Sequence, residues 1–154
     1  MNIPFMADIP VKDGTMTVAT STFRWSKRYS VNVAELDRQH QGLFAIVNEL
    51  NDALVTGEGA AVINSVLRRL VEYTRNHFAA EEALMTQHRF PALLTHCAEH
   101  DKFTRLVAKF VEDYRTGKSG VSVSLLLFLQ NWLKEHVLVS DKAYSSFLNT
   151  QGVR

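Results

Sequence analysis

Histidines and carboxylates occur in this sequence at spacings that place several of them on the inner faces of helices. One row of residues at intervals of three and four begins at Ile63 and runs through Leu70 and Thr74 to His77 and Glu81. The row predicts a helix whose buried face includes both His77 and Glu81. A buried carboxylate is costly unless a partner compensates its charge, and a metal ion is one such partner.

Three further segments have the same helical spacing, and each apolar row contains histidine. Asn32 and Glu35 are spaced like an N-cap and its capping-box partner, so the first helix is expected to begin at Asn32. The second helix is expected from about Ala60 to Thr86, and Pro91 fits the first turn of the third. The rows of the first, third and fourth helices are Leu36, His40, Leu43, Val47, Leu50 and Leu54; His96, His100, Phe103, Val107, Phe110 and Tyr114; and Leu126, Leu129, Leu133, His136, Ser140, Ala143 and Phe147.

Short loops between four long helices imply that neighbouring helices are antiparallel. The predicted fold is therefore all-α, an antiparallel up-down-up-down four-helix bundle. In this arrangement the starts of the first and third helices and the ends of the second and fourth share one end of the bundle. Seven side chains are expected to gather there, namely His40, His77, Glu81, His96, His100, His136 and Asp141.

A metal explains this cluster better than a metal-free network of hydrogen bonds does. Each buried ionised group would otherwise cost several kcal/mol, against a total stability of about 5–15 kcal/mol for a domain. The only cysteine, Cys97, is isolated and expected to be a buried bystander, which argues against structural zinc. Five imidazoles and two carboxylates suit two ions with bridging carboxylates, and imidazole-rich sites accept iron. Asp37 could accept a hydrogen bond from an imidazole or could be an exposed acid favoured by the helix dipole.

The spacing between His136 and Asp141 does not suit a regular helix. Residues five apart differ by about 140° around an α-helix, so the two side chains should not share a face. A local π-helical turn would bring them into register, and such turns are frequent at functional sites. We therefore predict a helix distortion between His136 and Asp141.

The composition is that of one globular domain. We expect the bundle to occupy residues 23–154, preceded by an N-terminal extension of residues 1–22 without a sustained period. The formal net charge of +1 includes no basic block, so nucleic acid and anionic membranes are not expected partners. Neither a signal peptide nor an apolar run of membrane-spanning length is present, so we expect a soluble, cytoplasmic protein without membrane insertion.

Between Phe23 and Leu148 the sequence contains a series of short motifs whose combined spacing is far more specific than any one motif. They are Trp25 with Tyr29-Ser30-Val31, Leu36-Asp37-Arg38-Gln39-His40, His77-Phe78-Ala79-Ala80-Glu81-Glu82-Ala83-Leu84-Met85, Phe90-Pro91, His96-x-x-x-His100, and Trp132-Leu133-x-x-His136-x-x-x-x-Asp141. With these motifs the sequence resembles the hemerythrins, specifically the single-domain bacteriohemerythrins. The family usually has glycine where this chain has Asn32, and asparagine tolerates turn geometry.

The resemblance implies a centre of two non-heme iron ions. The implied ligands of one iron are His96, His100 and His136. The implied ligands of the other are His40 and His77, with Glu81 and Asp141 bridging the two irons together with an oxo or hydroxo group. The two-histidine iron keeps an open position for dioxygen, beside an apolar pocket that limits the access of water. The implied pocket residues are Leu43, Phe78, Trp132, Leu133 and Val137.

The expected function is reversible dioxygen binding for storage, delivery or scavenging, with an oxygen-consuming protein as a further partner. One alternative is an oxygen or redox sensor, which would have to act in trans because no output domain is attached. The other alternative is a di-iron oxidase, peroxidase or nitric oxide reductase. No proton donor stands out beside the open iron and the pocket is apolar, so we expect a protein that is not an enzyme.

Overall fold

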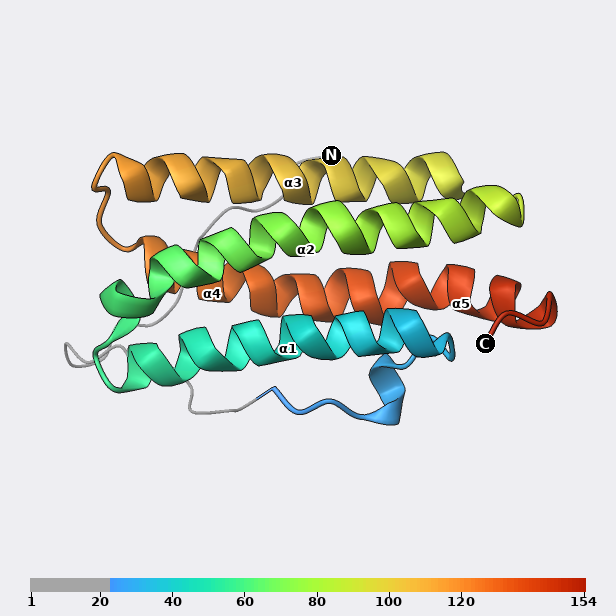
Figure 1. Cartoon of the computed structure of the whole chain (residues 1–154), viewed down its shortest axis with the longest axis horizontal. Coiled ribbons are helices and arrows are strands. Elements are labelled where there is room, and N and C mark those ends of the chain that lie inside the picture. The colour runs from blue at the N-terminus through green and yellow to red at the C-terminus, as the bar shows by residue number, and fades with distance from the viewer. Residues whose placement is uncertain (1–22) are drawn as a thin grey trace, which may run out of the picture.

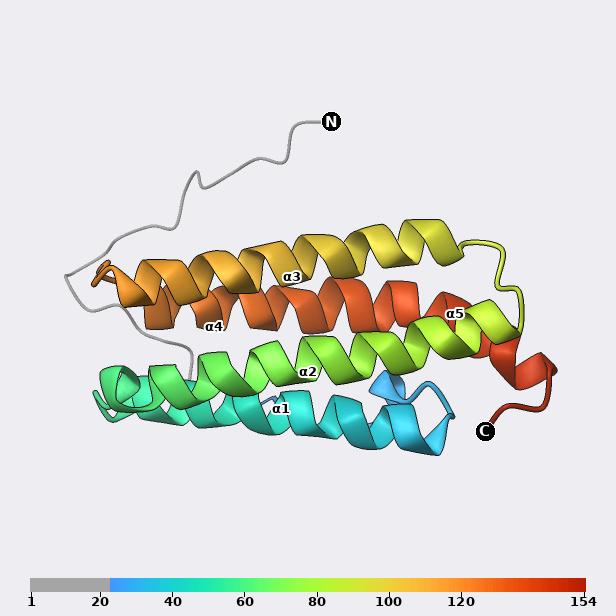
Figure 2. The ribbon, with the colours of Figure 1, turned by 45° about the horizontal axis from the view of Figure 1, so that its top comes forward.

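Long helices make up almost all of the computed structural model, which describes residues 23–154 (Figure 1). Successive helices run in opposite directions (Figure 2), so the predicted antiparallel four-helix bundle is confirmed. The predicted N-terminal extension, residues 1–22, lies outside the described residues. The elements are η1 Lys27–Tyr29, α1 Ala34–Val55, α2 Gly59–Gln87, α3 Leu93–Arg115, α4 Val121–Trp132, η2 Leu133–Ser140 and α5 Asp141–Thr150.

The fourth helix of the bundle is continuous but irregular. The segment η2, Leu133–Ser140, is π-helical and joins α4 to α5, which confirms the predicted distortion. The wider turns bring His136 and Asp141 onto one face, where both are buried. The predicted row was wrong beyond this point, because it was counted on a regular helix: Ala143 is exposed and Phe147 half-buried, whereas Tyr144 and Leu148 are buried.

The start of α1 differs from the prediction. The helix begins at Ala34 with Val33 as its N-cap residue, so Asn32 is not the cap. Asn32 instead has a left-handed backbone with φ 53°, a conformation that asparagine tolerates better than most residues do. Glu35 does not close a capping box either, and its carboxylate accepts hydrogen bonds from Arg38 and Gln39.

Two smaller expectations about the third helix were also wrong. Pro91 lies in the turn before α3, which begins at Leu93, rather than in its first turn. The last member of the predicted row, Tyr114, is 39% exposed, and the last buried residue of α3 is Val107. Within residues 23–154, no helix has both the length and the apolar character needed to cross a membrane.

The apolar core consists of two clusters along the bundle axis. The larger includes Leu43, Phe78 and Val137, and the smaller includes Leu36, Met85 and Tyr144 at the end where α1 begins. On α1, His40 lies between Leu36 and Leu43, and the corresponding position on α2 is Glu81. The polar layer is therefore enclosed by apolar side chains on both sides along the bundle.

Candidate metal centre

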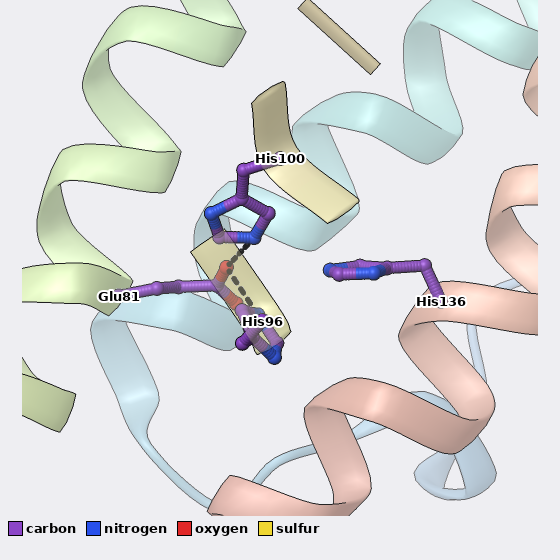
Figure 3. Close-up of side chains that lie close together, drawn as sticks. All are labelled: Glu81, His96, His100 and His136. Carbon is purple, nitrogen blue, oxygen red and sulfur yellow. Dashed lines mark ion pairs between the residues drawn. The ribbon is translucent and has the colours of Figure 1, made fainter. Parts of the chain in front are cut away.

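The structure brings all seven predicted polar side chains together in this layer. They come from α1, α2, α3, η2 and α5, and each is at most 3% exposed. Figure 3 shows Glu81 extending from α2 toward the rings of His96, His100 and His136. The complete set is His40, His77, Glu81, His96, His100, His136 and Asp141.

The two oxygens of the Glu81 carboxylate face different groups of imidazoles. Oε2 lies 3.0 Å from Nε2 of His100 and 3.6 Å from Nε2 of His96. Oε1 lies 3.2 Å from Nε2 of His77 and 3.6 Å from Nε2 of His40. A single carboxylate thus contacts both a group on α3 and a group formed by α1 and α2.

Asp141 has the same two-sided arrangement. Its Oδ1 lies 3.0 Å from Nε2 of His136 and 3.4 Å from Nε2 of His96. Its Oδ2 lies 3.1 Å from Nε2 of His40. Both carboxylates therefore lie between the three imidazoles of α3 and η2 and the two imidazoles of α1 and α2.

The buried atoms of the cluster fit a metal better than they fit one another. Among the described residues, no hydrogen-bond partner is found for Nε2 of His40, His96, His100 and His136, for Glu81 Oε2, or for either oxygen of Asp141. Buried polar atoms nearly always have a hydrogen-bond partner, so this many buried atoms without one in a single layer need an explanation. Imidazole nitrogens and carboxylate oxygens are common metal ligands. Here they form two groups, and within each group the ligand atoms lie within 4.8 Å of one another. One group is Glu81, His96, His100 and His136, and the other is His40, His77, Glu81 and Asp141.

Three imidazoles are held from outside the cluster through Nδ1. An Nδ1–H donor to an outer acceptor leaves the Nε2 lone pair directed inward, as in metal-ligating histidines. The expected alternative acceptor, Asp37, contacts no imidazole; it is half-buried and accepts hydrogen bonds from Val31 N–H and Ser30 Oγ. The observed pairs are His77 with Gln39 (2.7 Å), His100 with Glu82 (2.8 Å) and His136 with Glu99 (2.5 Å).

Tyr144 supports the cluster from the smaller apolar side. Its hydroxyl donates a hydrogen bond to Glu81 Oε1, and its ring lies edge-on to His96. Burial and the nearby carboxylates raise the pKa of Tyr144 well above its ordinary value, so it remains a neutral donor. Tyr144 was not among the predicted site residues, because it lies three residues after Asp141, on the row shifted by the π-helical segment.

The carboxylates change the proton affinity of the imidazoles. Burial alone would lower the pKa of His40, but the nearby carboxylates of Asp141 and Glu81 outweigh it and raise the pKa to about 9. The pKa of His136 is likewise raised to about 9, against the effect of burial, chiefly by the charge of Asp141. Burial lowers the pKa of His77. Metal binding to His40 and His136 at neutral pH must therefore displace protons.

The expected pocket residues adjoin the cluster from the larger apolar side. The Phe78 ring stacks on His100 with 3.7 Å between ring centroids, and the Trp132 ring stacks on His136 at 3.8 Å. Leu43, Leu133 and Val137 are at most 1% exposed and belong to the same apolar cluster as Phe78. Trp132 is half-buried, and Cys97 is half-buried rather than buried as expected.

Glu99 offers a test of the outer hydrogen bonds. Its carboxylate accepts hydrogen bonds from His136 Nδ1 and Ser140 Oγ, so Glu99→Ala should leave the His136 ring less firmly oriented. We expect the affinity of the metal-free protein for ferrous iron to fall by about 10- to 100-fold, measured against a competing chelator under nitrogen. The control is Glu112→Ala, which removes an exposed carboxylate of the same helix whose side-chain partner within residues 23–154 is Arg115. Equal affinities would show that Glu99 does not position His136 for metal.

The bundle and its buried layer of five imidazoles and two carboxylates define a four-helix-bundle metal-binding protein. The profile of a family described as the Hemerythrin HHE cation binding domain matches residues 31–148. The chain belongs to the hemerythrin family. It is thus a hemerythrin-type iron protein, iron being the metal that this family implies.

Individual relatives support this assignment over most of the chain. A bacteriohemerythrin of Methylococcus capsulatus is 31% identical over 79% of this chain and 92% of its own length. A hemerythrin-like protein of Naegleria gruberi is 33% identical, covering 86% of this chain and 98% of its own. The crystal structure of a wild-type hemerythrin superimposes with a TM-score of 0.74 at 30% identity, covering 82% of this chain and 97% of that one.

Proposed function

We propose that this protein binds dioxygen reversibly at a centre of two non-heme iron ions. The observation that carries the proposal is the pair of carboxylates, each of which has oxygens directed toward both groups of imidazoles. A carboxylate placed between two sets of nitrogen donors suits a bridging ligand. Its membership of the hemerythrin family, whose members bind dioxygen, supports the same conclusion.

The proposed ligands follow the two groups of donors. One iron would be held by His96, His100 and His136, and the other by His40 and His77, with Glu81 and Asp141 shared together with an oxo or hydroxo group. The group with two histidines has one nitrogen donor fewer, which would leave room for a small ligand on that side. Bound irons would supply the coordination position and the electrons that dioxygen requires.

The surrounding residues favour release of dioxygen over turnover. Phe78 and Trp132 cover imidazole faces, and Leu43, Leu133 and Val137 complete an apolar wall on the same side. Water and protons promote irreversible oxidation, so a wall that limits both should preserve the reduced protein. An oxygen-consuming protein is the proposed recipient, and the cytoplasm the proposed location.

Iron content and oxygen uptake test the proposal together. After loading with ferrous iron under nitrogen and removal of free metal, we expect two irons per chain and uptake of one dioxygen per chain, recovered when oxygen is removed. Continuous oxygen consumption with a reductant would indicate an enzyme. Oxidation without recovery of oxygen would favour a redox sensor, and a single iron would contradict the shared-carboxylate assignment.

A further inference from the structure

The hydroxyl of Tyr73 is buried beside the metal centre and has no hydrogen-bond partner among the described residues. Tyr73 lies one turn before His77 on α2, and the two rings stack with 4.7 Å between centroids and 24° between planes. The ring also lies edge-on to that of Phe78, with 6.1 Å between centroids and 72° between planes. Tyr73 therefore adjoins both a proposed iron ligand and the proposed pocket wall.

The hydroxyl is the inner end of the side chain. Tyr73 also lines a surface groove of about 540 Å³ between α1 and α2, together with Gln39, Gly42 and His77. The residue as a whole is half-buried although its hydroxyl is buried, so the ring spans from the groove toward the interior. The two residues leave α2 one turn apart and their rings stack, so the buried Tyr73 hydroxyl lies on the side of the cluster formed by His77.

Packing alone does not account for a tyrosine at this position. A buried donor without an acceptor destabilises the folded protein, and phenylalanine would fill the same space without that cost. A tyrosine hydroxyl is an O–H donor at neutral pH, so the buried Tyr73 hydroxyl requires an acceptor.

We propose that the Tyr73 hydroxyl donates a hydrogen bond to a small, negatively charged ligand at the open side of the metal held by His40 and His77. The proposal rests on the proposed function. The stacking of Tyr73 on His77 places the donor on the two-histidine side, whereas the other unpartnered donor nearby, Trp132 Nε1, belongs to a ring stacked on His136. No proton donor was predicted beside the open iron, and the Tyr73 hydroxyl is a candidate for that role.

Such a donor would set ligand selectivity. A hydrogen bond to a charged acceptor in a site of low polarity is stronger than one to a neutral acceptor. Tyr73 would therefore favour azide, or dioxygen that has accepted negative charge, over an uncharged ligand such as carbon monoxide. The position one turn from His77 on the same face of α2 is the signal by which the sequence could have revealed it.

Azide binding to the oxidised, iron-loaded protein tests the role of the hydroxyl. In Tyr73→Phe we expect the dissociation constant for azide to rise by about tenfold, the loss of one hydrogen bond to a charged acceptor, with iron content unchanged. The infrared stretch of bound azide should shift between H2O and D2O in the natural protein and not in Tyr73→Phe. The control is Tyr29→Phe, a buried tyrosine that packs on Trp25 and Phe44.

Urea unfolding of the metal-free proteins provides a readout independent of iron. Because the unpartnered hydroxyl is removed, Tyr73→Phe should be at least as stable as the natural protein. Azide affinities within twofold of each other, or loss of iron from Tyr73→Phe, would overturn the inference. If the natural protein itself does not retain two irons, the proposed function fails as well; equal azide affinity in two fully loaded proteins overturns only the role of Tyr73.

Discussion

Replacing Glu81 with alanine is expected to remove most of the bound iron. The carboxylate has one oxygen directed at each group of imidazoles, so its loss takes a ligand from both irons at once. It also leaves the two cations facing each other without the charge between them. We expect iron per chain, measured after loading and removal of free metal, to fall from two to well below one, while circular dichroism still reports a helical protein.

The neighbouring residue provides the control for Glu81→Ala. Glu82 contacts Nδ1 of His100 and is not placed between the two groups of imidazoles, so Glu82→Ala should bind iron more weakly than the natural protein but retain more iron than Glu81→Ala under the same loading and removal of free metal. The comparison separates the loss of a shared ligand from the loss of one negative charge near the site. Retention of two irons with an unchanged absorption spectrum in Glu81→Ala would show that Glu81 is not a bridge.

Replacing Phe78 with alanine is expected to destabilise the protein and to shorten the life of its reduced form. The ring is 5% exposed and stacks on His100, so its removal creates a cavity directly beside the centre. Truncation of a buried phenylalanine costs about 3–5 kcal/mol. Water admitted to the cavity should also accelerate irreversible oxidation by air several-fold.

Leu70→Ala distinguishes the two effects. Leu70 is fully buried in the same apolar cluster, two turns before His77 on α2, and its truncation should cost about 2–5 kcal/mol. We expect urea unfolding to show a loss of stability in both variants, whereas stopped-flow absorption should show faster oxidation only in Phe78→Ala. Equal oxidation rates in the two variants would mean that Phe78 does not protect the centre.

The helical period was enough to predict the bundle and the convergence of its polar residues. His77 and Glu81 lie on an uninterrupted apolar row, and short loops leave antiparallel packing as the simple solution. The five-residue interval between His136 and Asp141 also predicted the π-helical segment, because no regular helix brings both to one face. The prediction did not include the shift in register after this segment, which exposes Ala143 and buries Tyr144. That shift depends on how many wide turns the segment contains.

Other details depend on geometry that the period does not describe. Asparagine suits both a helix N-cap and a left-handed turn, so the residue type at Asn32 could not decide between them. Gln39, Glu82 and Glu99 lie beside the buried rows, and whether such flanking polar side chains reach an imidazole depends on rotamers and on the neighbouring helix. The position of Tyr73 one turn before His77 can be seen in the sequence, but the absence of a hydrogen-bond partner for its hydroxyl depends on the surrounding structure.

The most direct test of the central claim is one cycle of absorption spectra on the iron-loaded protein. The protein should be colourless when reduced under nitrogen, gain visible charge-transfer bands when air is admitted, and lose them when oxygen is removed. Return of the colourless state without added reductant is the predicted result, because only reversible binding restores the reduced irons. Bands that persist until a reductant is added, or no visible band at full iron loading, would contradict reversible dioxygen binding.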